Sequence, residues 1–144
     1  MDVDGEWMRR APWILGIAAS AILIGAVKVG PVRAAGDDEA ARPQFYTARV
    51  RPIFQANCFR CHAGMNRRGG LSMSTRAGLM KGGKDGAVIL SGDPAKSLLV
   101  NGIRHEGAAK PMPSKGNKLS DADIATIERW IRAGAIMPAD VPVN

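Results

Sequence analysis

The feature that most constrains this chain of 144 residues is the pentapeptide Cys58-Phe59-Arg60-Cys61-His62. It contains both cysteines of the sequence. Two residues separate the thiols, which places them on one turn of the chain, and a histidine follows the second thiol directly. Two cysteines in a chain of this length exclude a disulfide-dense secreted scaffold. The fold must therefore rest on an apolar core, or on a group that this pentapeptide binds.

The pattern C-x-x-C-H is typical of c-type haem attachment, with each thiol adding to one vinyl group and the histidine binding the iron. Three alternatives fit less well. A thioredoxin-like redox pair would lie beside a βαβ pattern, which the sequence lacks. A zinc site needs four ligands, and the histidines complete only a badly spaced set. A simple disulfide leaves His62 unexplained. We predict one covalent haem c held by Cys58, Cys61 and His62.

The second axial ligand of the iron is the next question, and methionine or histidine is the usual choice. His105 is the only other histidine, and its place at the end of an expected helix is typical of a solvated residue. Met112 lies between Pro111 and Pro113, which restrict the backbone of a loop that presents one sulfur. We predict Met112 as the ligand. The remaining methionines after residue 34 are interpreted as fillers of apolar gaps: Met65, Met73, Met80 and Met137.

The N-terminal segment reads as an export signal. Residues 13–27 are uncharged and mostly apolar, two arginines precede them, and short residues end at Ala34. This is the plan of a signal peptide over residues 1–34, cleaved after Ala34. The alternative is an uncleaved membrane anchor, although a spanning helix needs roughly 20 apolar residues and this run is shorter. We expect a periplasmic protein, anchored to the membrane only if the segment is not cleaved.

Helical periodicity dominates the rest of the chain, and no stretch alternates as a strand would. We expect an acidic linker over residues 35–43, one helical domain over 44–138 and a tail over 139–144. One predicted helix ends near Val50 and a new turn starts at Pro52. Two more cover 75–81, capped by Ser74, and 94–104, capped by Asp93. The last runs from Asp121 to Ala133: Ser120 caps it, isoleucines recur at helical spacing, and Gly134 ends it. Residues 64–92 are rich in glycine and read as long loops. The fold class is therefore all-α.

Aromatic residues are few for a domain of this size, and only five follow residue 34. A haem bonded into the centre would supply the missing apolar bulk, so we expect poor folding without it. The expected haem and core packers are Phe45, Tyr46, Phe54, Leu71, Leu79, Leu98, Leu99, Ile103, Ile127, Trp130 and Ile131.

Four blocks in order carry a family resemblance: VRPIFQANCFRCH, GGLSMSTRAGLMKGG, ILSGDPAKSLL and MPSKGNKLSDADIATIERWIRAGA. The stretch from Val50 to Ala135 resembles class I cytochrome c domains, and the planctomycete type in particular. The resemblance implies a small all-α fold wrapped around one haem, with thioethers at Cys58 and Cys61 and axial ligation by His62 and Met112. It also implies that the first and last helices cross, with Trp130 near the haem.

These features predict an exported single-haem electron carrier rather than an enzyme, because two filled axial positions leave no site for oxygen or peroxide. Two alternatives stay open: an electron-transfer subunit of a periplasmic dehydrogenase, and a haem sensor with a displaceable ligand. The chain has 20 Lys and Arg against 13 Asp and Glu. Five lysines of the loops are candidates for a positive rim that steers acidic redox partners: Lys81, Lys84, Lys110, Lys115 and Lys118. Export and the lack of interleaved aromatics exclude nucleic acid as a partner.

Overall fold

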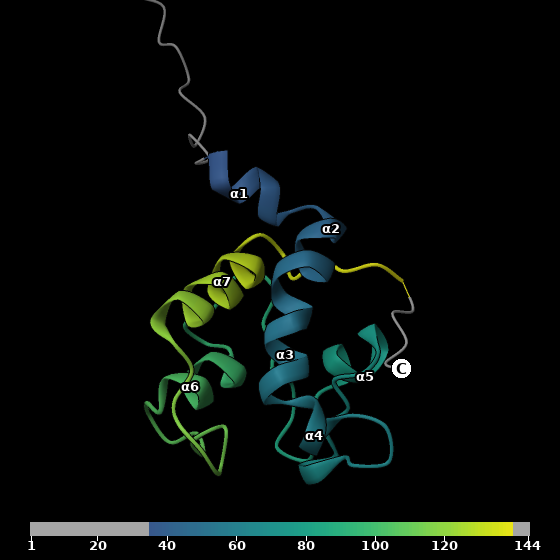
Figure 1. Cartoon of the computed structure of the whole chain (residues 1–144), viewed down its shortest axis with the longest axis vertical. Coiled ribbons are helices and arrows are strands. Elements are labelled where there is room, and N and C mark those ends of the chain that lie inside the picture. Colours follow the sequence, from purple (N-terminus) through teal and green to yellow (C-terminus); the bar gives the residue numbers. More distant parts are fainter. Residues whose placement is uncertain (1–34, 140–144) are drawn as a thin grey trace, which may run out of the picture. The chain divides into compact units, whose positions relative to one another are not determined.

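The computed structural model describes residues 35–139, where helices are joined by long loops (Figure 1). Within that range the only β pairing is an isolated bridge between Gly83 and Gly86, so the all-α prediction is confirmed. The elements are α1 (Ala35–Ala40), α2 (Pro43–Phe45), the π-helical turn η1 (Tyr46–Val50), α3 (Arg51–Asn57), α4 (Phe59–His62), the 3-10 turn η2 (Arg68–Gly70), α5 (Arg76–Lys81), α6 (Leu98–Arg104) and α7 (Asp121–Arg132).

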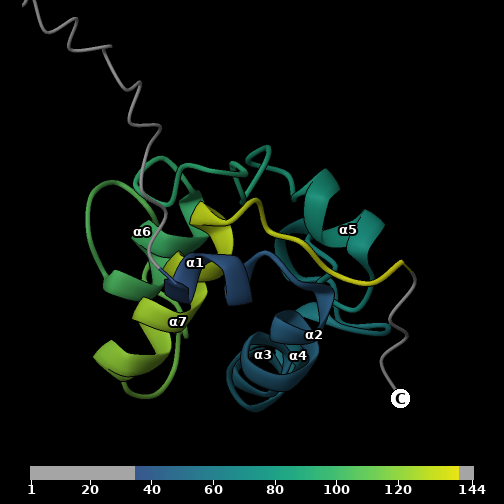
Figure 2. The same ribbon diagram turned by 90° about the horizontal axis from the view of Figure 1, so that it is seen from above.

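The sequence predicts a helix break at Pro52, but the helix before the pentapeptide continues through this residue. α2, η1 and α3 follow one another along a single axis, which is clear when they are viewed from above (Figure 2). Arg51 keeps helical dihedrals, and its N–H bonds to the carbonyl of Tyr46, five residues back. Proline cannot donate to the ladder and its ring crowds the preceding turn. The chain accommodates Pro52 by widening one turn rather than by ending the helix.

The start of the domain also differs from the prediction of a linker over residues 35–43. Ala35–Ala40 forms α1, which packs against α7. Ala40 is completely buried and belongs to the apolar core. The acidic residues indicate solvated chain, but the small residues on either side of them let one face of the helix approach its neighbour. This stretch is therefore part of the packed structure.

The helix predicted over residues 94–104 begins later, as α6 at Leu98. Asp93 does accept a hydrogen bond, from the N–H of Lys96 at 3.1 Å, but it closes only a turn. Ser97 ends that turn, with a fully buried hydroxyl that donates to the carbonyl of Asp93 and accepts from the N–H of Leu90. The later start leaves Leu98 38% exposed, on the wall of the cavity described below rather than in the core.

The other two predicted helices are confirmed, with one change of cap. α5 ends at Gly82, whose φ of 81° suits glycine, but its N-cap is Thr75 rather than Ser74. The Thr75 hydroxyl accepts the N–H of Gly78 at 3.0 Å. α7 is capped by Ser120, which accepts from the N–H of Asp123 at 3.1 Å. Short side-chain acceptors thus mark both starts, although at α5 the capping residue is the neighbour of the predicted one.

The core lies where η1 and α3 pack against α7. Trp130 is completely buried between Tyr46 and Phe54, with ring centroids 5.4 and 6.0 Å away, and its indole N–H bonds to the carbonyl of Ile136 at 2.7 Å. These contacts join the first helical run to the last helix. Of the methionines expected as gap fillers, Met65 is fully exposed, which contradicts the prediction for that residue.

Residues 1–34 and 140–144 lie outside the described residues, and with them the predicted export signal and most of the predicted tail. Over residues 35–139, every helix is too short or too polar to cross a bilayer.

Candidate cofactor-binding site

The pentapeptide lies at the end of the first helical run, where α3 gives way to the short α4. The N–H of Cys58 bonds to the carbonyl of Phe54 at 2.8 Å. The N–H groups of Cys61 and His62 both bond to the carbonyl of Cys58, at 3.0 and 2.9 Å. One turn of helix therefore carries both thiols and the imidazole. The thiols are free and do not form a disulfide.

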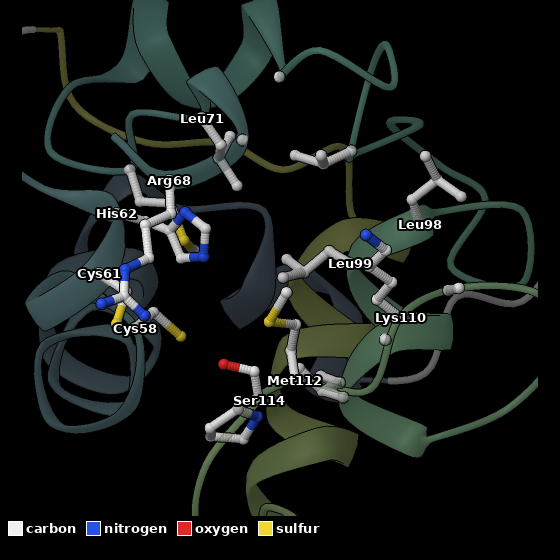
Figure 3. A pocket seen from close by; sticks show the side chains of 18 of the residues that line it. Cys58, Cys61, His62, Arg68, Leu71, Leu98, Leu99, Lys110, Met112 and Ser114 are labelled. Atoms are coloured by element: carbon white, nitrogen blue, oxygen red, sulfur yellow. The ribbon is translucent and has the colours of Figure 1, made fainter. Parts of the chain in front are cut away.

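A cavity of about 1040 Å³ opens between this turn and the C-terminal half of the domain. Figure 3 shows the His62 ring and the cysteine sulfurs on one side, and the Met112 thioether pointing toward them from the other. The structure thus brings all four predicted site residues to the wall of one cavity. Apolar side chains make up much of the remaining wall, among them Leu71, Met73, Val88, Leu99, Ile103 and Leu119.

Burial controls the ionisation of the pentapeptide. It raises the pKa of the Cys58 thiol to about 12, and the neighbouring Cys61 adds to the shift. A thiol that stays protonated at neutral pH is unlike the thiolate of a redox-active pair, whose pKa is lowered. Burial also lowers the pKa of His62 below its ordinary value, against the smaller opposite effect of the Arg68 and Leu71 backbone. The imidazole is therefore neutral at pH 7 and has a lone pair to offer.

One nitrogen of that imidazole has no partner. Nδ1 of His62 is buried and makes no hydrogen bond within the described part of the chain. A buried polar atom without a partner is costly. A histidine that binds a metal usually donates its other ring N–H to a carbonyl or carboxylate, and the backbone of Arg68 and Leu71 lies near enough to act on the pKa of His62.

Met112 is held against α6 by its own backbone. Its N–H bonds to the carbonyl of Gly102 at 2.9 Å, and its carbonyl lies 3.2 Å from Nε2 of His105. Gly102 is buried, and a Cβ there would lie 3.3 Å from the carbonyl of Lys110 and 3.7 Å from Cγ of Met112. The loop can approach this closely because the helix has no side chain at Gly102.

Positive charge lines the cavity. Three of the five lysines predicted as a rim are present in its wall, whereas Lys81 and Lys118 are not. Two arginines that the sequence analysis did not single out join them. The basic residues of the wall are Arg60, Arg68, Lys84, Lys110 and Lys115. The carboxylate of the wall, Asp85, is paired with Lys84 at 2.6 Å, which lowers its pKa.

This geometry can be set beside known proteins. Residues 58–116, which run from the first cysteine past Met112, match the planctomycete cytochrome C family. This part of the chain is therefore similar to a cytochrome c domain. Cytochrome c6 of Picosynechococcus sp. strain PCC 7002 is 39% identical over 83 residues, covering 55% of this chain and 65% of that protein. The chain thus spans just under two thirds of the length of that relative. No solved structure matches the chain.

The cofactor of a cytochrome c domain is haem c, attached covalently, and the cavity fits it. Two free thiols share one turn, a neutral imidazole lies beside them with its Nδ1 unpartnered, and a thioether faces them from the opposite wall. Apolar walls suit the porphyrin, while the arginines and lysines suit its two carboxylates. Trp130 is not among the lining residues, in contrast to the expectation that it lies near the haem.

Some of the site could not be found from sequence. His105 is an exposed helix end, as predicted, but the sequence did not indicate that its ring contacts the Met112 carbonyl. Gly102 gave no signal, because its role is to lack a side chain where the Met112 loop passes. Arg68 lies beside His62 only because the loop after the pentapeptide folds back, with the N–H of Met73 bonded to the carbonyl of His62.

Proposed function

We propose that this domain carries single electrons between redox partner proteins, with haem c held by thioethers at Cys58 and Cys61 and the iron ligated by His62 and Met112. The observation that supports this most is the placing of an imidazole and a thioether on facing walls of one cavity (Figure 3). A histidine and methionine pair raises the reduction potential relative to two histidines and leaves no open coordination position.

The residues of this chain divide the work. When bound, haem c supplies an iron that exchanges one electron between its ferrous and ferric states. Cys58 and Cys61 fix the porphyrin to α4, and His62 contributes a neutral nitrogen because burial lowers its pKa. Met112 contributes a soft sulfur from a loop fixed to α6. The apolar wall excludes water, which favours the less charged iron site.

The donor and acceptor proteins are proposed to be acidic. The basic residues around the cavity place positive charge where the porphyrin would be reached from outside. Exposed charges interact over roughly 10 Å at 0.1 M salt, so the electron-transfer rate with an acidic partner should fall steeply as salt is raised. We propose that this exchange takes place in the periplasm, after residues 1–34 have directed export.

The test is a haem spectrum of protein expressed in a periplasm, wild type beside Met112→Ala. We expect covalent haem in both, and the weak far-red absorption band of a thioether bound to ferric iron only in the wild type. Met65→Ala is the matched control, since that methionine is fully exposed and should keep the band. Wild type without covalent haem would overturn the cofactor assignment. A band that survives in Met112→Ala would overturn the axial pair.

The rate of carbon monoxide binding distinguishes an electron carrier from a haem sensor. If Met112 ligates firmly, carbon monoxide binds the reduced wild type slowly and reduced Met112→Ala fast. Rapid binding to the wild type would contradict the carrier function and favour a sensor.

A further inference from the structure

His105 has an unusual backbone for a residue with a side chain. It ends α6 with φ 59° and ψ 41°, the left-handed conformation that glycine usually occupies after a helix. Glycines stand close by in the sequence, and Gly107 has a positive φ as well. A histidine in place of glycine at this helix end indicates that its ring has a role.

Among the described residues, the ring has one hydrogen-bond contact, and it is with the proposed ligand loop. Nε2 of His105 lies 3.2 Å from the backbone carbonyl of Met112. The N–H of Met112 bonds to the carbonyl of Gly102, which lies one turn before His105 on α6. Both backbone polar groups of Met112 are thus held by the last turn of one helix. The left-handed backbone of His105 is what turns its ring back toward the loop.

That helix end is itself fixed to the core. Arg104, the neighbour of His105, pairs with Glu128 of α7 at 2.5 Å, and the N–H of Glu106 bonds to the carbonyl of Asn101 at 3.0 Å. His105 therefore projects from a helix end that an ion pair joins to α7. A contact made from such a position constrains its partner more than a contact between two loops would.

We propose that His105 is a positioning residue for the thioether of Met112. Resting on the proposed ligation, its imidazole donates the Nε2 proton to the Met112 carbonyl and holds that peptide so that the side chain points into the cavity. Without the ring, the N–H contact to Gly102 remains, but the peptide can rotate about it. The thioether then leaves the iron more often, and an added ligand takes its place more easily.

The test is an imidazole titration of the ferric haem protein, followed by loss of the thioether band. His105→Ala removes the ring, and His105→Gln keeps a side-chain N–H donor at the same position. Loss of one hydrogen bond should raise the apparent imidazole affinity of His105→Ala by between about two- and tenfold, with His105→Gln within about twofold of wild type. His105→Gly, which suits the left-handed backbone, replaces the alanine variant if that variant does not fold.

The outcomes separate the two proposals. Unchanged imidazole affinity in His105→Ala overturns the positioning role even if its melting temperature falls, because a merely structural residue would move stability alone. Failure of His105→Gln to restore the wild-type affinity also contradicts the hydrogen-bond argument. A wild-type protein without the thioether band overturns the ligation proposal itself, and the role of His105 falls with it.

Discussion

The hydroxyl of Ser97 should be worth about 2 kcal/mol of stability to this domain. Ser97 is fully buried at the start of α6. Its hydroxyl donates to the carbonyl of Asp93 at 2.8 Å and accepts the N–H of Leu90 at 2.9 Å. Within residues 35–139, the Leu90 N–H makes no other hydrogen bond. In Ser97→Ala two bonds are lost, and a donor is left without a partner, which together cost roughly 1–3 kcal/mol.

The assay is thermal and denaturant unfolding of the haem-loaded protein. For a domain of about 100 residues, 1 kcal/mol moves the melting temperature by roughly 4–8 °C, so Ser97→Ala should melt some 8–16 °C lower. Ser91→Ala is the matched control, because Ser91 is exposed and makes no hydrogen bond, and it should stay within about 0.5 kcal/mol.

The same variant distinguishes stability from ligation. Ser97 lies at the opposite end of α6 from His105, so the thioether band of Ser97→Ala should match wild type at every temperature below unfolding. A melting temperature within 2 °C of the control, roughly 0.5 kcal/mol or less, would refute the argument. It would mean that water or a local rearrangement satisfies Leu90 and Asp93 once the hydroxyl is gone.

Three more predictions follow from single contacts. Burial raises the pKa of Tyr46, against the opposing charge of Arg51. The folded state therefore holds the phenol proton to higher pH than the unfolded state, and this contribution to stability is lost as pH rises above about 10. Tyr46→Phe should show a smaller alkaline fall in denaturant midpoint than wild type, and equal falls would contradict this. Gly82→Ala should unfold the domain or cost at least about 2 kcal/mol of stability, because φ is 81° and the new Cβ would collide with the carbonyl of Gly86. Calorimetry of the haem protein measures this cost, and a change below about 1 kcal/mol would contradict the prediction. Gly102→Ala should raise imidazole affinity, because the new Cβ would lie 3.3 Å from a carbonyl of the ligand loop. Its melting temperature should change little, since the gain in helix propensity, about 1 kcal/mol, offsets this crowding. An unchanged imidazole titration would contradict the close approach.

Local features of the sequence predicted local structure well. Ser120, the isoleucine repeat and Gly134 marked α7, because a cap, an apolar face and a stop act within a few residues of one another. The prediction failed where a local signal competed with distant packing. Pro52 indicated a break, yet the helix continues because the turn before it packs against α7 and Phe54 after it packs against Trp130. The acidic stretch indicated a linker, yet Ala40 is buried against the core.

The sequence by itself determined the chemistry of this protein. Cys58, Cys61 and His62 stand within five residues, so their shared turn follows from the geometry of one helical turn and needs no knowledge of the rest of the chain. Met112 could be proposed from its two prolines, but nothing local brings it to the same cavity. That approach depends on α6 packing against α7, on the missing side chain of Gly102 and on the ring of His105. Contacts between residues far apart in sequence have no pattern along the chain, and only the tertiary structure decided them.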